Sequence, residues 1–287
     1  MLEMKSCCRV PFPEKLCEGY EICEDSVYAN VNASKVTGMM ERFIKEADGP
    51  VFFILEIPTD AENQPEGDFC SDVYYIDGLD GESALRLLSE TGELLVNDGM
   101  NKFGFGVHSN GEEILFGKYN VMSVYAKDTR KYGRFFEDFG INKTRELITA
   151  WDTFDSEHPG DSFCCEQIYD IPKKFREYGM YFAERRYDDG SIVPISFREL
   201  LGKTALVGIS RYGKDGACIG RTQFFGTVTR ADEKVIVISE PGGEEHTLPP
   251  DTSPVRRARP GEYKLRSNGQ TVKDPDFLIT WNVMPQE

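Results

Sequence analysis

The feature that most constrains the fold is a short apolar run at residues 51–57, VFFILEI. It follows Gly49–Pro50, which ends a helix predicted over residues 34–47, and it precedes a polar loop predicted over residues 58–71. An apolar run of this length between turn-forming residues is typical of a strand that is buried on both faces. The run therefore predicts the central strand of a sheet.

Helical and strand periodicities extend through the first 190 residues. Ser34 is the expected N-cap of the first helix, whose apolar residues form one stripe. Further helices are predicted at residues 81–90, 129–139 and 144–154, the last of them opened by a capping box. Strands are predicted at residues 72–76, 93–96, 102–108, 113–116, 119–126 and 180–187. Because Asn110–Gly111 is also a hairpin signal, we expect an α+β domain with a mostly antiparallel sheet, residues 1–190.

The pattern changes at about residue 196. A short helix is expected at residues 196–201, and every later segment has strand character. These strands are predicted at residues 205–210, 223–229, 235–239, 245–248, 263–266 and 277–283. Turn residues separate them at short intervals, which is typical of a small all-β barrel or sandwich, here residues 196–287. The fold class is therefore α+β with two domains.

Negative charge is concentrated in the first domain. Residues 51–100 hold twelve acidic residues and one basic residue, Arg86. The last 92 residues hold 13 basic and 12 acidic residues, so the chain's net charge of −16 leaves −17 on residues 1–195. Such a block attracts cations or basic proteins and repels nucleic acid. The one basic cluster, Arg256, Arg257 and Arg259, could contact phosphate or pair with acidic residues of the same chain.

The sequence is typical of a cytoplasmic protein. The first 28 residues have no apolar core typical of a signal peptide, and no window approaches the length of a membrane span. The eight cysteines are accordingly expected to be free thiols. Four of them lie between residues 7 and 23 without the paired spacing of a zinc site. No metal or cofactor is expected.

The C-terminal domain contains three segments with many turn residues: FFGTV at 224–228, LPPD at 248–251 and PGEYKLRSNG at 260–269, followed by DPDF at 274–277 and Trp281. With this pattern, roughly the last 85 residues resemble a β domain that recurs in uncharacterised bacterial proteins and implies no activity. Gly261 and Gly269 occupy positions where turns need positive φ, and Asp274 is expected to cap a turn. In charge, size and mixture of helices and strands, the whole chain also resembles bacterial toxin-immunity proteins.

Two groups of side chains have the composition of chemical sites. His158 with Cys164 or Cys165 could act as base and nucleophile of a hydrolase, although loop hydrogen bonding explains His158 as well. Asp77, Asp80 and Glu82 place three carboxylates in one turn. Oxygen ligands at this density suit Ca²⁺, but the simpler interpretation is a turn in which Asp80 or Ser83 caps the next helix.

The leading functional hypothesis is a non-enzymatic module that occludes a basic protein, such as a secreted bacterial nuclease toxin. Its contacts would be the carboxylates Asp72, Asp77, Asp80 and Glu82, with Trp151 as an aromatic anchor. The alternative for Trp151 is a core aromatic under a loop. The alternatives for the protein are the hydrolase, a scaffold that oligomerises through its β domain, and acidity that serves solubility alone.

Overall fold

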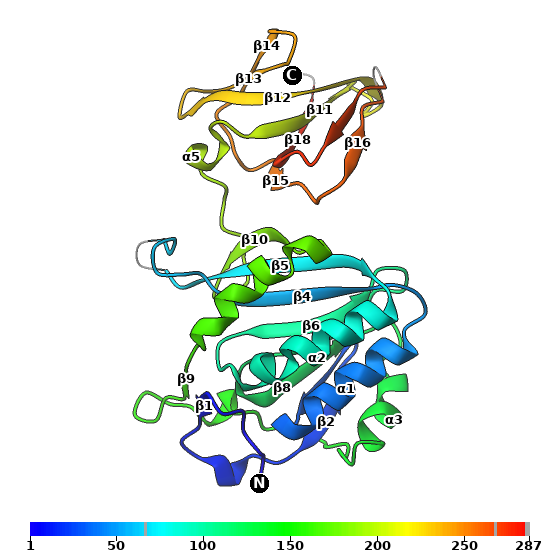
Figure 1. The fold of residues 1–287 in the computed structure, drawn as a ribbon, viewed down its shortest axis with the longest axis vertical. Helices are drawn as coiled ribbons and strands as arrows, with labels where there is room; N and C mark the ends of the chain where they lie inside the picture. The colour runs from blue at the N-terminus through cyan, green and yellow to red at the C-terminus, as the bar shows by residue number, and fades with distance from the viewer. Residues whose placement is uncertain (66–67, 267–268, 285–287) are drawn as a thin grey trace. The chain divides into compact units, whose positions relative to one another are not determined.

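The computed structural model describes residues 1–65, 68–266 and 269–284. The chain forms two compact units, Met1–Asp189 and Gly190–Glu287. The architecture is mixed α+β and is dominated by two large sheets, one in each unit (Figure 1). None of the helices in the described ranges is long and apolar enough to cross a membrane.

The sheet of the first unit has eight strands in the order β10-β5-β4-β6-β7-β8-β3-β2, and all neighbours are antiparallel. The strands are β2 Gly19–Ile22, β3 Ser26–Asn30, β4 Val51–Pro58, β5 Cys70–Leu79, β6 Lys102–Val107, β7 Glu112–Phe116, β8 Val121–Tyr125 and β10 Tyr181–Tyr187. The prediction of a central buried strand is confirmed, because β4 lies between β5 and β6. Phe53 and Leu55 join the main core, whereas Phe52 and Ile54 face a smaller apolar cluster.

Two helices, α1 Ala33–Glu46 and α2 Gly81–Asn97, pack side by side on one face of this sheet (Figure 1). The predicted strand at residues 93–96 is wrong, because these residues form the last turn of α2. Leu88, Thr91 and Leu95 continue the helical spacing of buried residues. A short apolar run fits a helix and a strand equally well when it is considered alone.

The next helix, α3 Lys131–Glu137, lies within the predicted range 129–139. The predicted helix at residues 144–154 is wrong, and a loop with the single turn η3 Trp151–Thr153 takes its place. Tertiary contacts use the backbone groups that a helix would need. Thr144 donates its N–H to the carbonyl of Tyr20 at 2.8 Å, and Leu147 donates to a carboxylate oxygen of Glu21 at 2.8 Å.

The remaining elements of the first unit are short. They are β1 Cys8–Arg9, η1 Pro13–Lys15, η2 Lys118–Asn120, β9 Asp161–Ser162, η4 Glu166–Asp170, α4 Ile171–Lys174 and η5 Arg176–Tyr178. The predicted hairpin is confirmed, since Gly111 between β6 and β7 has φ +74°. Part of the predicted loop over residues 58–71 lies between β4 and β5, and its residues 66–67 are outside the described ranges.

The second unit has a six-stranded sheet in the order β14-β13-β12-β11-β18-β15 and a separate hairpin of β16 and β17. The strands are β11 Thr204–Tyr212, β12 Cys218–Asp232, β13 Val235–Ser239, β14 Glu245–Leu248, β15 Val255–Arg257, β16 Glu262–Lys264, β17 Thr271–Lys273 and β18 Phe277–Val283. Of the barrel or sandwich expected here, a closed barrel does not form among the described residues, because the outer strands β14 and β15 do not pair. The helix predicted at residues 196–201 is α5 Phe197–Leu200, which begins with a capping box of Ser196 and Glu199.

Two turn predictions for the second unit are confirmed. Gly261 and Gly269 have φ values of +146° and +75°. Asp274 accepts the backbone N–H of Gly261 through its carboxylate at 2.7 Å, so its side chain caps the turn. Ser267 and Asn268, which belong to the PGEYKLRSNG segment, lie outside the described residues.

Gly104 in the middle of β6 is expected to be indispensable. A Cβ atom there would lie 1.9 Å from the carbonyl oxygen of Ile114 in the neighbouring strand, so Gly104→Ala forces the two strands apart. The expected loss in the free energy of unfolding of the first unit is about 2–4 kcal/mol. Gly208 in β11 is the matched control, because a Cβ atom there meets nothing within 4 Å. Urea unfolding of both variants measures the difference, and equal stability of the two would contradict this packing.

Candidate functional site

The acidic segment at residues 51–100 is partly neutralised by basic residues that lie far away in the sequence. Strand β10 pairs with β5 in a register that sets Arg185 opposite Asp72. Their side chains form an ion pair at 2.6 Å, and Asp72 also accepts from the hydroxyl of Thr59 at 2.8 Å. Arg186 of the same strand lies 3.7 Å from Glu56. The sheet topology therefore supplies partners for Asp72 and Glu56, whereas six other acidic residues of the segment are exposed and form no ion pair among the described residues: Asp60, Glu62, Asp68, Asp80, Glu82 and Glu93.

The three carboxylates at the start of α2 make different interactions. Asp77 interacts with Nε2 of His108 at 2.7 Å and accepts from the hydroxyl of Tyr181 at 2.8 Å. Asp80 is the N-cap of α2 and accepts the backbone N–H of Ser83 at 2.7 Å, a hydrogen bond that lowers the pKa of Asp80. Glu82 is exposed in the first turn of the helix. The cap interpretation accounts for Asp80, and only Asp80 and Glu82 face solvent freely.

The structure does not join His158 to the two cysteines. Nδ1 of His158 lies 3.0 Å from the carboxylate of Asp155, and its ring packs against Phe12. Within the described ranges no hydrogen bond links it to Cys164 or Cys165. Burial raises the pKa of both thiols to about 12, whereas a catalytic thiol needs a lowered pKa.

A thiol pair and a lysine lie under the N-terminal segment. The sulfur atoms of Cys7 and Cys165 are 3.5 Å apart. Lys5 is almost fully buried, with its ammonium 5.0 Å from the centre of the Phe116 ring and with no hydrogen-bond partner among the described residues. Burial lowers the pKa of Lys5 to about 8. No sequence pattern indicates this burial, since Lys5 resembles any other charged residue near a terminus.

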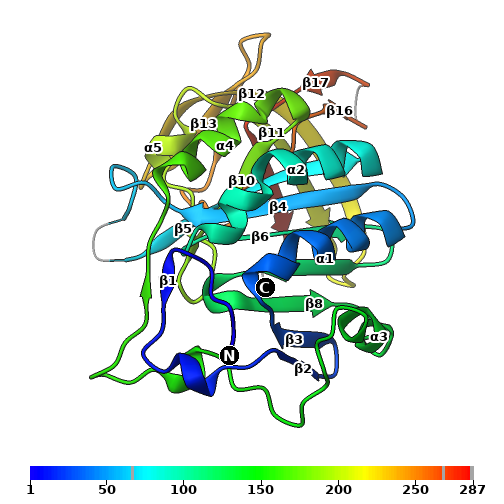
Figure 2. The ribbon, with the colours of Figure 1, turned by 60° about the horizontal axis from the view of Figure 1, so that its bottom comes forward.

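A long segment with little regular structure, residues 142–163, follows α3; we name it the Trp151 loop. The hydrogen bond from Thr144 holds its start to β2, and the side chain of Asn30 donates to the carbonyl of Ile148 at 2.8 Å in its middle. Its end forms β9, which pairs with β1, and Figure 2 shows these two short strands side by side. Loops of this length without regular structure are uncommon in compact domains and are often functional.

Trp151 is the exposed centre of an aromatic cluster in this loop. Its side chain is 53% exposed, yet its ring stands edge-on to Tyr119 at 4.8 Å and contacts Phe154 at 5.7 Å between ring centres. Tyr119 and Asn120 both have positive φ, +53° and +64°, which is strained for the bulky side chain of Tyr119 but readily adopted by asparagine. The fold maintains this strain while Tyr119 supports Trp151, an arrangement typical of functional sites.

The loop that carries this aromatic cluster is acidic. The loop has two basic residues at its start, Lys143 and Arg145, and five exposed acidic residues after them: Glu146, Asp152, Asp155, Glu157 and Asp161. A hydrogen bond from the hydroxyl of Thr149 lowers the pKa of Asp152, and the backbone N–H of His158 lowers that of Asp155. These two carboxylates are therefore fixed in place and ionised at neutral pH. The loop presents an apolar anchor within a field of negative charge.

The residues that could hold a metal lie elsewhere, on the β13–β14 hairpin. Donor atoms of Glu240, Glu244 and His246 lie within 4.8 Å of one another. Nε2 of His246 is 2.6 Å from Glu240 and 3.9 Å from Glu244, and its ring stacks on Phe224. A hydrogen bond between His246 and Glu240 explains this contact fully. The sequence contained these residues within one turn, but no known metal-ligand spacing distinguished them.

The basic cluster of the second unit is engaged within that unit. Arg257 pairs with Glu199 at 2.6 Å, and its guanidinium lies over the ring of Phe277. Arg256 donates to the carbonyls of Ser253 and Val255. Arg256 and Arg257 therefore have partners that a bound phosphate would have to replace.

Comparison with known proteins found no matching family model, no matching curated protein and no matching solved structure. Interpretation of the site consequently depends on its own geometry. Of the predicted contact residues, Trp151, Asp80 and Glu82 are exposed, whereas Asp72 and Asp77 are engaged within the sheet. The acidic residues near Trp151 are plain in the sequence. Because a helix was predicted at residues 144–154, they were not expected to share one loop.

Alkylation by iodoacetamide tests the description of the thiols. Cys17, Cys23 and Cys218 are exposed and should be labelled first at pH 7. Cys164 and Cys165 should react more slowly than these three, and faster as the pH rises towards 12, because only the thiolate attacks. Peptide mass spectrometry follows each site. A Cys164 or Cys165 that reacts faster than the exposed thiols at pH 7 would restore the hydrolase hypothesis.

Lys5→Met tests the buried amine. The pKa of Lys5 in the folded protein is about 8, below its ordinary 10.5, so the unfolded chain keeps the proton longer. The stability of the wild type should therefore rise between pH 8 and 10.5, by roughly 3 kcal/mol relative to Lys5→Met. Below pH 8 the amine is charged in both states, and the variant should be the more stable protein. Urea unfolding of both proteins across this range measures the difference, and a constant difference would show that Lys5 titrates normally.

Proposed function

We propose that this protein is a non-enzymatic cytoplasmic binding module that captures a basic protein through the Trp151 loop. The observation that carries the proposal is the half-exposed Trp151, supported edge-on by Tyr119 in a loop that carries five exposed carboxylates. Tryptophan is the side chain most often found at the energetic centre of protein interfaces. An apolar anchor with a polar, charged rim matches the general composition of such interfaces.

Electrostatics supports a cationic partner. No lysine or arginine lies between Glu146 and Phe163, and the unit as a whole is strongly acidic. Complementary charge accelerates the encounter of two proteins and is screened by salt. Binding should therefore be fast at low ionic strength and weaker at high ionic strength. The loop's net charge also disfavours nucleic acid as the ligand.

Attachment of the loop to the body of the unit favours tight binding. Ala150, beside Trp151, is buried in the small core formed with Leu2, Cys8 and Leu16. Thr149 is held by Asp152, and β9 is held by β1. A surface that is already ordered loses little conformational entropy on association. We infer that the loop is a preorganised recognition surface.

The partner class that fits best is a secreted bacterial toxin with a basic active face, such as a nuclease. The carboxylates of the loop would replace the phosphates that a nuclease binds, and Trp151 would close the interface against water. Asp80 and Glu82 would add attraction at long range. This proposal rests on the charge distribution and on the resemblance to toxin-immunity proteins, and it assigns occlusion as the mechanism.

Trp151→Ala tests the proposal. The full chain is immobilised and exposed at low salt to a lysate of its own organism, and the retained basic protein is identified and purified. We expect the variant to weaken binding of that protein by about 30-fold or more in calorimetry, as is typical of an aromatic hot spot. Tyr178→Ala is the matched control, because Tyr178 is an aromatic residue of similar exposure outside the loop. Equal losses in the two variants, or binding that is insensitive to salt, would refute the proposed surface.

A further inference from the structure

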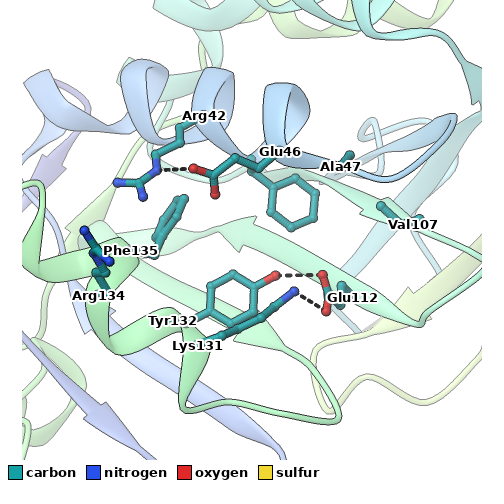
Figure 3. Close-up of a pocket in the computed structure, with 10 residues that line it drawn as sticks. Arg42, Glu46, Ala47, Val107, Glu112, Lys131, Tyr132, Arg134 and Phe135 are labelled. Atoms are coloured by element: carbon teal, nitrogen blue, oxygen red, sulfur yellow. Dashed lines mark hydrogen bonds and ion pairs between the residues drawn. The ribbon is translucent and has the colours of Figure 1, made fainter.

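A cavity of about 210 Å³ lies in the first unit, apart from the Trp151 loop. Figure 3 shows it between the C-terminal half of α1, the ends of β6 and β7, and helix α3. Its apolar wall consists of the buried residues Phe43, Val107, Tyr132 and Phe135. None of its lining residues belongs to residues 142–163, so the cavity and the proposed protein-binding surface are independent.

The charged groups around this cavity are mostly paired with one another. Arg42 binds Glu46 at 2.7 Å and Asp138 at 3.0 Å, and its guanidinium lies over the ring of Phe135. Glu112 accepts from the ammonium of Lys131 and from the hydroxyl of Tyr132. Both carboxylates that line the cavity are therefore already neutralised.

Arg134 is the exception. It lines the cavity, and its guanidinium has no hydrogen bond or ion pair with any residue in the described ranges. In Figure 3, Arg134 and Arg42 flank Phe135 at one end of the cavity, and Glu112 lies at the other end. The lining thus carries three basic and two acidic side chains in a chain whose net charge is −16. Asp138, which binds Arg42, brings the acidic groups around the cavity to three, so the charges balance, and Arg134 is the one cation of this group without a carboxylate partner among the described residues.

We propose that the cavity binds a small carboxylic acid with a flat or compact apolar body. The carboxylate would pair with Arg134 in the bidentate geometry that guanidinium groups favour. The apolar body would lie against Phe135 and Tyr132, whose rings already stand edge to face at 5.7 Å. The volume is smaller than that of typical drug-sized sites, so the ligand is a fragment-sized molecule.

The test is titration of the full-length, ¹⁵N-labelled protein with sodium benzoate, followed by amide chemical shifts. Saturable shifts in the millimolar range are expected around residues 42–47 and 131–135, because so small a molecule binds weakly. Benzamide, which has the same shape without the charge, should bind about tenfold more weakly or not at all. Inorganic phosphate, an anion without an apolar body, should not saturate these residues.

Three variants separate the charge from the cavity and from folding. Arg134→Gln should weaken benzoate binding about tenfold or more. Arg130→Gln is the matched control: it removes one positive charge near the same helix, but Arg130 pairs with Asp128 and does not line the cavity. Ala47→Leu should block the cavity sterically while leaving every charge in place. Unchanged binding in Arg134→Gln, equal shifts with benzamide, or equal shifts with phosphate would each overturn the proposal.

Discussion

The ion pair between Asp72 and Arg185 joins the most acidic segment of the first unit to strand β10. It forms because β10 returns from a distant part of the sequence and pairs with β5 in antiparallel register. Arg186 enters the same region and faces Glu56. The most acidic segment of the sequence is thus partly neutralised by its own fold. Negative charge that remains available to a partner lies on its exposed carboxylates, Asp60, Glu62, Asp68, Asp80, Glu82 and Glu93, and on those of the Trp151 loop.

That loop owes its form to tertiary contacts rather than to local propensity. Its apolar residue Ala150 is buried, its backbone is bonded to β2, and its end is a strand of a two-stranded sheet. Tyr119, in the connection between β7 and β8, packs against Trp151. Both Tyr119 and Asn120 have left-handed backbone conformation. Strain of this kind persists only where the surroundings over-determine it. Trp151 is therefore held at the surface by its neighbours and is not part of the core.

Much of the fold followed from sequence pattern, and the failures have physical causes. The run at residues 51–57 was recognisable because both faces of β4 are buried. The segment at 93–96 was misread because a buried last turn of a helix is as apolar as a strand. The predicted helix at 144–154 failed because Tyr20 and Glu21, more than a hundred residues away, bind its backbone. For the same reason, the exposure of Trp151 and the pairing of Asp72 are properties of the topology and not of local sequence.

The most direct test of the account is hydrogen–deuterium exchange of the full chain, free and bound to the basic protein that it retains at low salt. We expect protection on binding to be concentrated in residues 142–163 and around Tyr119, which packs against Trp151. We also expect little change in β5 and β10, where Asp72 and Arg185 already satisfy each other. Protection centred on residues 70–98, with the loop exchanging as in the free protein, would contradict the account and return the binding surface to the acidic segment.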